Sequence, residues 1–66
     1  ELREEEVQVL RFIAEKGGRV LESDLRKKFI LPKTSLWRLV RRLERLGYVR
    51  VSKVGIQNEI ELVRRV

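Results

Sequence analysis

The residues with the clearest chemistry in this 66-residue chain are arginines that recur at helical spacing within one segment. Arg38, Arg41 and Arg45 are three and four residues apart, so a helix would place them on one face. Along that helix, only Glu44 is close enough to offset their mutual repulsion. Guanidinium groups bond well to phosphates and to guanine edges. The spacing therefore predicts a surface for a polyanion, and the alternative is a solvated face of a thermostable helix.

The composition argues against catalysis. The sequence has no Cys and no His, which removes disulfides, thiolate chemistry, nearly every zinc site and the usual acid–base residue. The Ser and Thr hydroxyls have no His to activate them. We therefore expect a protein that is not an enzyme and that holds no metal and no cofactor.

The net charge of +6 is concentrated in the middle of the chain. Residues 33–53 hold seven Lys or Arg against one acid, whereas residues 1–15 hold five acids and two bases. A basic centre favours a nucleic-acid partner. The abundance of Arg, Lys and Glu without Cys or Met is typical of a thermophile. We find no signal peptide and no apolar run near the ~20 residues of a membrane span, which indicates a cytoplasmic protein.

Apolar spacing predicts a first helix over residues 3–16. Its apolar stripe consists of Leu10, Ile13 and Ala14, with Val9 and Leu2 beside them. The glutamates at its start are interpreted as solubilising charges that match the helix dipole. Phe12 points away from the stripe, so it either packs back onto the C-terminal segment or contacts a second copy or another domain.

Two further helices are predicted. Ser23 is a plausible N-cap for a short helix over residues 24–29. Pro32 opens a third helix over about residues 32–46, and Gly47 supplies its left-handed C-cap. The core side of this third helix consists of Leu36, Leu39, Val40, Leu43 and Leu46. The opposite arc holds Thr34, Arg38, Arg41 and Arg45, with Trp37 on one flank and Arg42 on the other.

Strands complete the predicted fold. Residues 19–21 are long enough only for a brief strand. After Gly47 the apolar period changes to two, in YVRVSK and again in NEIEL, and a short turn with a glycine separates the two runs. We therefore expect an α+β fold in a single domain, residues 1–66. Because the chain lacks Met, we expect this domain to come from a longer protein.

The segment LPKTSLWRLVRRLERLGYV resembles the recognition-helix region of winged helix-turn-helix transcription regulators. It is most similar to the IclR type at its start and to the MarR type at its end, and EEEVQVLRFIAEKGG looks like the opening helix of the MarR type. The whole chain also resembles the DNA-binding domain that ends several archaeal membrane-associated regulators. The resemblance implies a fold of three helices followed by a two-stranded wing. It also implies that the domain lies in the cytoplasm, and it allows a parent protein that is anchored in the membrane.

Carried over by position, the resemblance implies two sets of DNA contacts. The base-reading set is Lys33, Thr34, Trp37, Arg38 and Arg41. The phosphate-contacting set is Ser23, Ser35, Arg42, Arg45, Lys53 and Gln57. Two positions depart from the family pattern. Ile30 stands where many relatives have glycine in the turn, and the wing tip GIQN lacks the arginine that is common there.

The sequence leaves more than one function open. The main hypothesis is sequence-specific binding of double-stranded DNA as the reading head of a transcription regulator. The alternative is a winged-helix protein–protein interaction module in a replication, transcription or degradation assembly. RNA binding is a third hypothesis, although few aromatic residues are available for base stacking. We expect the isolated domain to be monomeric, because Phe12 is the only conspicuous spare apolar group, and a dimeric parent would pair elsewhere.

Overall fold

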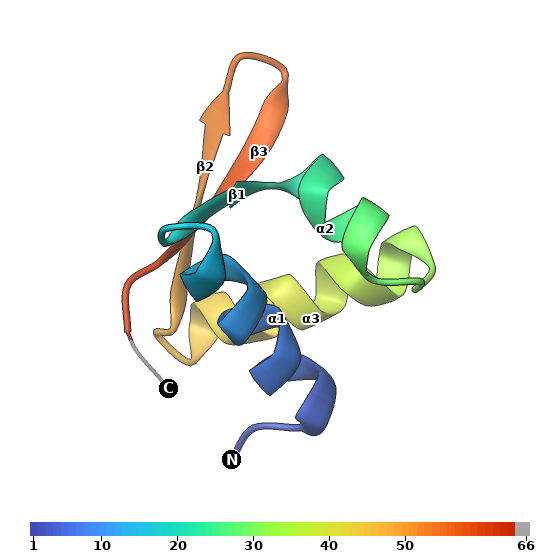
Figure 1. Ribbon diagram of the computed structural model, residues 1–66, viewed down its shortest axis with the longest axis vertical. Coiled ribbons are helices and arrows are strands. Elements are labelled where there is room, and N and C mark those ends of the chain that lie inside the picture. The colour runs from blue at the N-terminus through green and yellow to red at the C-terminus, as the bar shows by residue number, and fades with distance from the viewer. Residues whose placement is uncertain (65–66) are drawn as a thin grey trace.

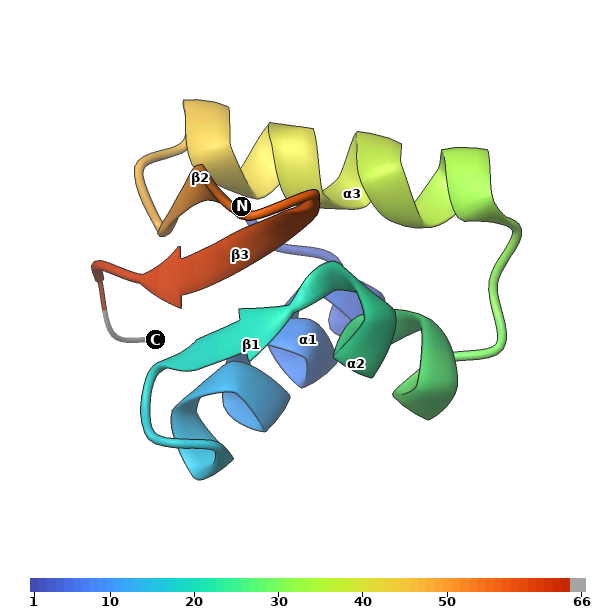
Figure 2. The same ribbon diagram turned by 90° about the horizontal axis from the view of Figure 1, so that it is seen from above.

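A computed structural model describes residues 1–64 as three helices and three strands. In chain order these are α1 (Glu4–Glu15), β1 (Arg19–Leu21), α2 (Glu22–Lys28), α3 (Lys33–Arg45), β2 (Val49–Val54) and β3 (Gln57–Leu62). The strands form one antiparallel sheet in the order β1-β3-β2. Figure 1 shows the β2–β3 hairpin extending beyond the helices, and Figure 2, seen from above, shows α3 on one side of the molecule and α1 and α2 on the other. The predicted α+β winged helix-turn-helix fold is confirmed.

Glycine ends α3 as predicted. The backbone N–H of Gly47 donates to the carbonyl of Glu44, and that of Tyr48 donates to the carbonyl of Leu43. This paired pattern needs a left-handed residue, and Gly47 has a φ of 85°. Gly17 ends α1 in the same way, so both long helices stop where the next element must turn back.

The second helix begins earlier than predicted. The sequence suggested residues 24–29 with Ser23 as the N-cap, but α2 spans Glu22–Lys28 and contains Ser23 in its first turn. Asp24 takes part in capping the N-terminus of α2 instead, because its Oδ2 accepts a hydrogen bond of 3.0 Å from the backbone N–H of Leu21. A carboxylate in the first turn also interacts favourably with the helix dipole.

The β2–β3 hairpin turns in only two residues, Gly55 and Ile56, because Val54 pairs directly with Gln57. Gly55 has a φ of 65° and Ile56 has a negative φ, as a type II′ turn requires. On its other side β3 pairs with β1, which places Ile60 opposite Val20. The predicted brief strand and the predicted hairpin are thus parts of one sheet.

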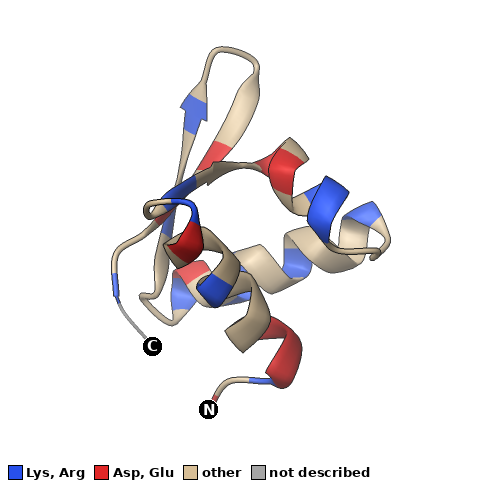
Figure 3. Cartoon of the chain, in the orientation of Figure 1, with Lys and Arg blue, Asp and Glu red and all other residues tan. Residues whose placement is uncertain are grey.

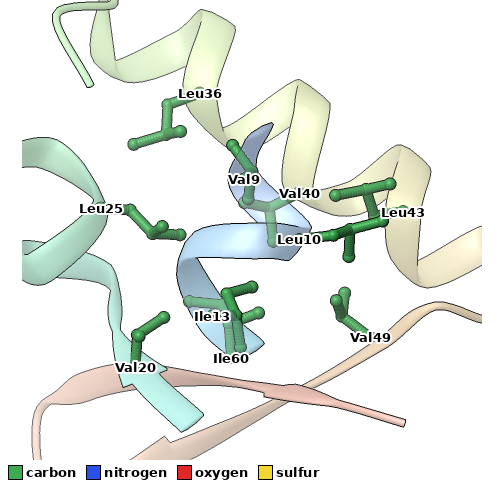
Figure 4. Close-up of a cluster of buried hydrophobic side chains, with 10 residues drawn as sticks. All are labelled: Val9, Leu10, Ile13, Val20, Leu25, Leu36, Val40, Leu43, Val49 and Ile60. Carbon is green, nitrogen blue, oxygen red and sulfur yellow. The ribbon is translucent and has the colours of Figure 1, made fainter. Parts of the chain in front are cut away.

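The core draws side chains from every helix and strand (Figure 4). Its buried members are Val9, Leu10, Ile13, Val20, Leu25, Leu36, Val40, Leu43, Val49 and Ile60. Two residues expected there lie outside it: Ala14 is exposed and Leu46 is 38% exposed. The buried face of α1 is rotated toward Glu6, which is itself buried. No helix in the described part of the chain is long and apolar enough to cross a bilayer.

Phe12 packs against α2. Its ring meets the ring of Phe29 edge to face, with the centroids 5.8 Å apart. The ammonium groups of Lys16 and Lys28 lie 5.6 and 6.0 Å from its centroid. The ring partner of Phe12 is thus Phe29, the residue after α2, and not the C-terminal segment that one of the two expectations named. The most exposed large apolar side chains among residues 1–64 are Ile30 and Ile56.

Candidate nucleic-acid interface

One side of α3 packs into the core and the other faces solvent. Leu36, Val40 and Leu43 are buried at helical spacing. Six residues of the predicted sites are exposed on α3, which are Lys33, Thr34, Ser35, Arg38, Arg41 and Arg45. Basic residues therefore recur along α3, whereas the start of α1 is acidic (Figure 3).

Trp37, Arg41 and Glu44 form a connected group on one flank of α3. The guanidinium carbon of Arg41 lies 4.7 Å from the centroid of the Trp37 ring. Nη1 of Arg41 lies 2.6 Å from Oε1 of Glu44. Trp37 is half-buried and packs against the core. The ring therefore supports the guanidinium and limits its rotamers, while the carboxylate offsets part of its charge.

Three other cations of α3 have no such partner. Among the residues that the structure describes, no carboxylate lies within ion-pair distance of Lys33, Arg38 or Arg45. Like charges on one helix face repel each other and lower helix stability. Bringing an external anion to this face would relieve the repulsion, so the face is suited electrostatically to a polyanion.

Arg42 is turned toward α1 and away from the outer face. Its Nη1 lies 2.5 Å from Oε2 of Glu6, whose side chain is only 2% exposed. Glu6 is therefore no solubilising charge, and Glu44 is not the only acid that offsets the arginines of α3. The contact of Arg42 with phosphate stays a prediction, and its guanidinium is already bonded to a buried carboxylate in the free domain.

The Glu6 carboxylate is ionised within this contact. Burial opposes ionisation, but hydrogen bonds from the Arg42 guanidinium and from the Arg3 backbone N–H outweigh it, so the pKa of Glu6 lies below its ordinary value of 4.5. The Arg3 N–H donates to Oε1 at 2.7 Å. A charged, hydrogen-bonded pair thus joins the start of α1 to the C-terminal half of α3.

An open groove runs beside the first half of α3. Its lining consists of Arg3, Glu5, Glu6, Leu31, Ser35, Arg38, Leu39 and Arg42. Because Glu6 and Arg42 neutralise each other, the charges left at the groove are those of Arg3, Arg38 and Glu5. Arg3 was not among the predicted site residues, since it lies 32 positions before Ser35 and no local pattern connects them.

The wing is fastened to α2 by side-chain hydrogen bonds. Ser23 Oγ donates to Gln57 Oε1 at 3.1 Å, and Asn58 Nδ2 donates to Glu22 Oε1 at 3.1 Å. Ser23 and Gln57 were predicted separately as phosphate contacts, and the structure brings them together. The Ser23 hydroxyl proton is used in this bond, which leaves the Gln57 amide N–H groups for a ligand. Lys53 is exposed on the same wing.

On the outer face of the sheet, the arginines lie beside an acid. Arg50 pairs with Glu61 at 2.6 Å, and Arg19 lies 3.6 Å from the same carboxylate. The hydrogen bond from Arg50 lowers the pKa of Glu61. Because Arg19 and Arg50 share one carboxylate, their charge is only partly offset, but each of them has an acidic partner that Lys33, Arg38 and Arg45 lack within residues 1–64.

Comparison with known proteins identifies a family but no individual relative. No curated protein and no solved structure matches the chain significantly. A family model described as a winged helix DNA-binding domain matches residues 2–56. The matched part contains all three helices, β1, β2 and the turn of the wing. The chain therefore belongs to the winged helix DNA-binding domain family.

Proposed function

We propose that this domain binds double-stranded DNA in a sequence-specific manner and serves as the reading head of a transcription regulator. The observation that carries the proposal is the outer face of α3, where Lys33, Arg38 and Arg45 lack carboxylate partners among residues 1–64. Family membership supports DNA as the polyanion.

In the proposed complex α3 lies in the major groove, whose width accommodates an α-helix. The base-reading set stays as predicted: Lys33, Thr34, Trp37, Arg38 and Arg41. Arg38 is the strongest candidate within it, because it is exposed and has no ion-pair partner in the described chain. Trp37 contributes mainly by orienting Arg41, on which it stacks. Arg45 and Lys53 hold phosphates on either side.

The rival function is docking on another protein. Acids that interrupt the basic face of α3 would favour it. Glu6 and Glu44 each form an ion pair with an arginine of α3. Glu5 is the remaining acid among the described residues that line the groove. The remaining charge on the outer face is therefore positive, which favours DNA over a protein partner.

We further propose the finer placement that the sequence suggested. The domain is of the MarR or IclR type and comes from a cytoplasmic, or membrane-anchored, regulator of a thermophilic archaeon. The isolated domain is monomeric. The motif LPKTSLWRLVRRLERLG supports the type, and the abundance of charged residues supports the thermophilic source.

Fluorescence anisotropy with a labelled pool of random duplexes tests the proposal. We expect a dissociation constant in the micromolar range at low salt and, for about four phosphate contacts, a slope of log K against log salt of about −3.6. The double variant Lys33→Gln/Arg38→Gln should bind far more weakly. The matched control Arg11→Gln/Arg19→Gln removes the same charge from α1 and β1 and should bind nearly as the wild type. Absence of binding at low salt would overturn the DNA proposal and favour a protein partner.

A further inference from the structure

A second basic surface lies in an open groove formed by the end of α1, by β1 and by α2. Figure 2 shows α1 and α2 on the side of the molecule opposite α3. A duplex seated on the outer face of α3 would therefore leave this groove accessible. The groove holds four cations and one acid, and its lining consists of Phe12, Lys16, Arg19, Val20, Asp24, Lys27 and Lys28.

The cations of this groove are poorly matched by acids. Lys16, Lys27 and Lys28 are exposed, and no carboxylate within residues 1–64 lies at ion-pair distance from them. Arg19 lies 3.6 Å from Glu61, which is closer to another arginine. The helix dipoles favour cations near the ends of α1 and α2, but like charges brought together from three elements repel each other. An external anion in the groove would relieve this repulsion.

The ring of Phe12 organises two of these cations. Nζ of Lys16 lies 5.6 Å from the ring centroid and Nζ of Lys28 lies 6.0 Å from it, although one lysine follows α1 and the other ends α2. Phe29 packs edge to face with the same ring and holds it between the two helices. The attraction to the ring limits the rotamers of both lysines, so less conformational entropy is lost when they bind an anion.

The lining of the groove favours an acidic peptide over a duplex. Phe12 is only half-buried, so apolar surface remains between the cations. The phosphate rows of a duplex make no use of this surface, whereas a peptide can place an apolar side chain between two acids. Asp24 in the groove would also repel a continuous row of phosphates. Charge and apolar surface together therefore match an acidic segment that carries an apolar residue.

We propose that this groove binds an acidic peptide segment of a partner protein, in which an apolar side chain is flanked by Asp or Glu. The carboxylates of the segment bond to Lys16, Lys27 and Lys28, and its apolar side chain packs on Phe12. None of these residues belongs to the predicted DNA contacts, so the groove does not depend on the proposed function. The domain can bind DNA through α3 and the partner through the groove at the same time.

Fluorescence anisotropy with two labelled peptides, GEEDFEEDG and GEEDSEEDG, tests the groove at about 0.15 M salt, where distant charges are screened. The wild type should bind the peptide with Phe about tenfold more tightly than the peptide with Ser, because part of one ring is buried. Lys16→Gln/Lys28→Gln should bind the Phe peptide about tenfold more weakly than the wild type. The matched control Lys33→Gln/Arg38→Gln removes the same charge from α3 and should bind this peptide within about twofold of the wild type.

Random duplexes should show the opposite order, with Lys16→Gln/Lys28→Gln binding as the wild type and Lys33→Gln/Arg38→Gln binding far more weakly. Equal binding of the two peptides, equal losses in the two double variants, or no binding of the Phe peptide by the wild type would overturn the groove. Weaker binding of duplexes by Lys16→Gln/Lys28→Gln would assign the groove to nucleic acid and overturn it as well. If the wild type binds the Phe peptide as expected but no duplex, only the DNA proposal is overturned.

Discussion

Arg38 and Arg42 lie one turn apart in α3, and the contrast between them separates folding from function. Arg42 is 31% exposed and is held by Glu6, which is buried. Arg38 is exposed and has no carboxylate partner within residues 1–64. The two residues have the same side chain and helical environment. What differs is whether α1 presents an acid opposite them.

This difference shows how a helix rich in arginine can serve two purposes. A buried ion pair rarely stabilises a fold more than apolar residues of the same shape would, because both charges lose hydration. Its requirement for a specific geometry instead fixes how the two helices meet. We infer that Arg42 and Glu6 set the position of α3 relative to α1, so that Arg38 and Arg45 are presented outward.

The largest expected effect comes from breaking the buried pair. Glu6→Gln removes the charge that balances Arg42 but keeps the side-chain volume. Removing one partner of a buried pair costs 3–5 kcal/mol, and the partial exposure of Arg42 reduces this to about 2–3 kcal/mol. In so small a domain the melting temperature should fall by about 10 °C or more. Thermal unfolding followed by circular dichroism measures the change.

Glu5→Gln is the control for this variant, because Glu5 is the adjacent exposed acid and has no ion-pair partner in the described chain. Its melting temperature should stay close to that of the wild type. The pKa of Glu6 is lower in the fold than its ordinary value of 4.5, so the pair stabilises fully above pH 4.5 and less as the pH falls through the folded pKa. The difference between wild type and Glu6→Gln should therefore shrink in acid. A pH-independent difference would contradict the ion-pair explanation.

The next effect concerns sequence discrimination by the outward arginines. Arg38→Ala should cost about 1–3 kcal/mol on a preferred sequence and less on random duplexes, because a base-edge contact is lost. Arg41→Ala should cost less, since its guanidinium is already shared with Glu44 and Trp37. Competition binding against variant duplexes, selected from a random pool, measures both.

Arg45→Ala provides the comparison for these variants. Arg45 lies at the last residue of α3, beyond the groove-entering end, so its loss should weaken all sequences alike. If the Arg38, Arg41 and Arg45 variants all lost the same affinity on every DNA sequence, α3 would contact only phosphates. The stability of Arg38→Ala should stay within about 0.5 kcal/mol of the wild type, unlike that of Glu6→Gln.

Local patterns in the sequence predicted most of the fold. Pro32 and Gly47 delimited α3, because each favours a backbone geometry that belongs to one end of a helix. The alternation after Gly47 predicted the wing. The start of α2 was missed because Ser23 and Asp24 both suit a helix start, and Asp24 at the third helical position provides the observed hydrogen bond.

The site was harder to predict because its contacts join distant parts of the chain. Glu6 and Arg42 are 36 positions apart, and nothing in a helical wheel of α3 shows that α1 places an acid beside it. The bond between Ser23 and Gln57 spans 34 positions and depends on how the wing folds over α2. For the same reason, the sequence did not show that Phe12 packs against Phe29. Spacing predicts which face of a helix is polar, but the acids that neutralise that face come from tertiary packing.

The smallest expected effect tests whether Glu44 restrains Arg41 in the free domain. Exposed ion pairs contribute about 0.2–1 kcal/mol, so Glu44→Gln should release Arg41 and tighten binding to random duplexes by about twofold to fivefold. Glu15→Gln, at the exposed end of α1, removes the same charge away from α3 and should change binding less. Removing any acid also raises the overall attraction to DNA, so the decisive measurement is a double-mutant cycle with Arg41→Ala. If Glu44 acts through Arg41, the gain from Glu44→Gln should largely disappear once Arg41 is alanine. An equal gain in both backgrounds would mean that Glu44 acts only as a bulk negative charge, and the guanidinium of Arg41 would then be as available to DNA as that of Arg38.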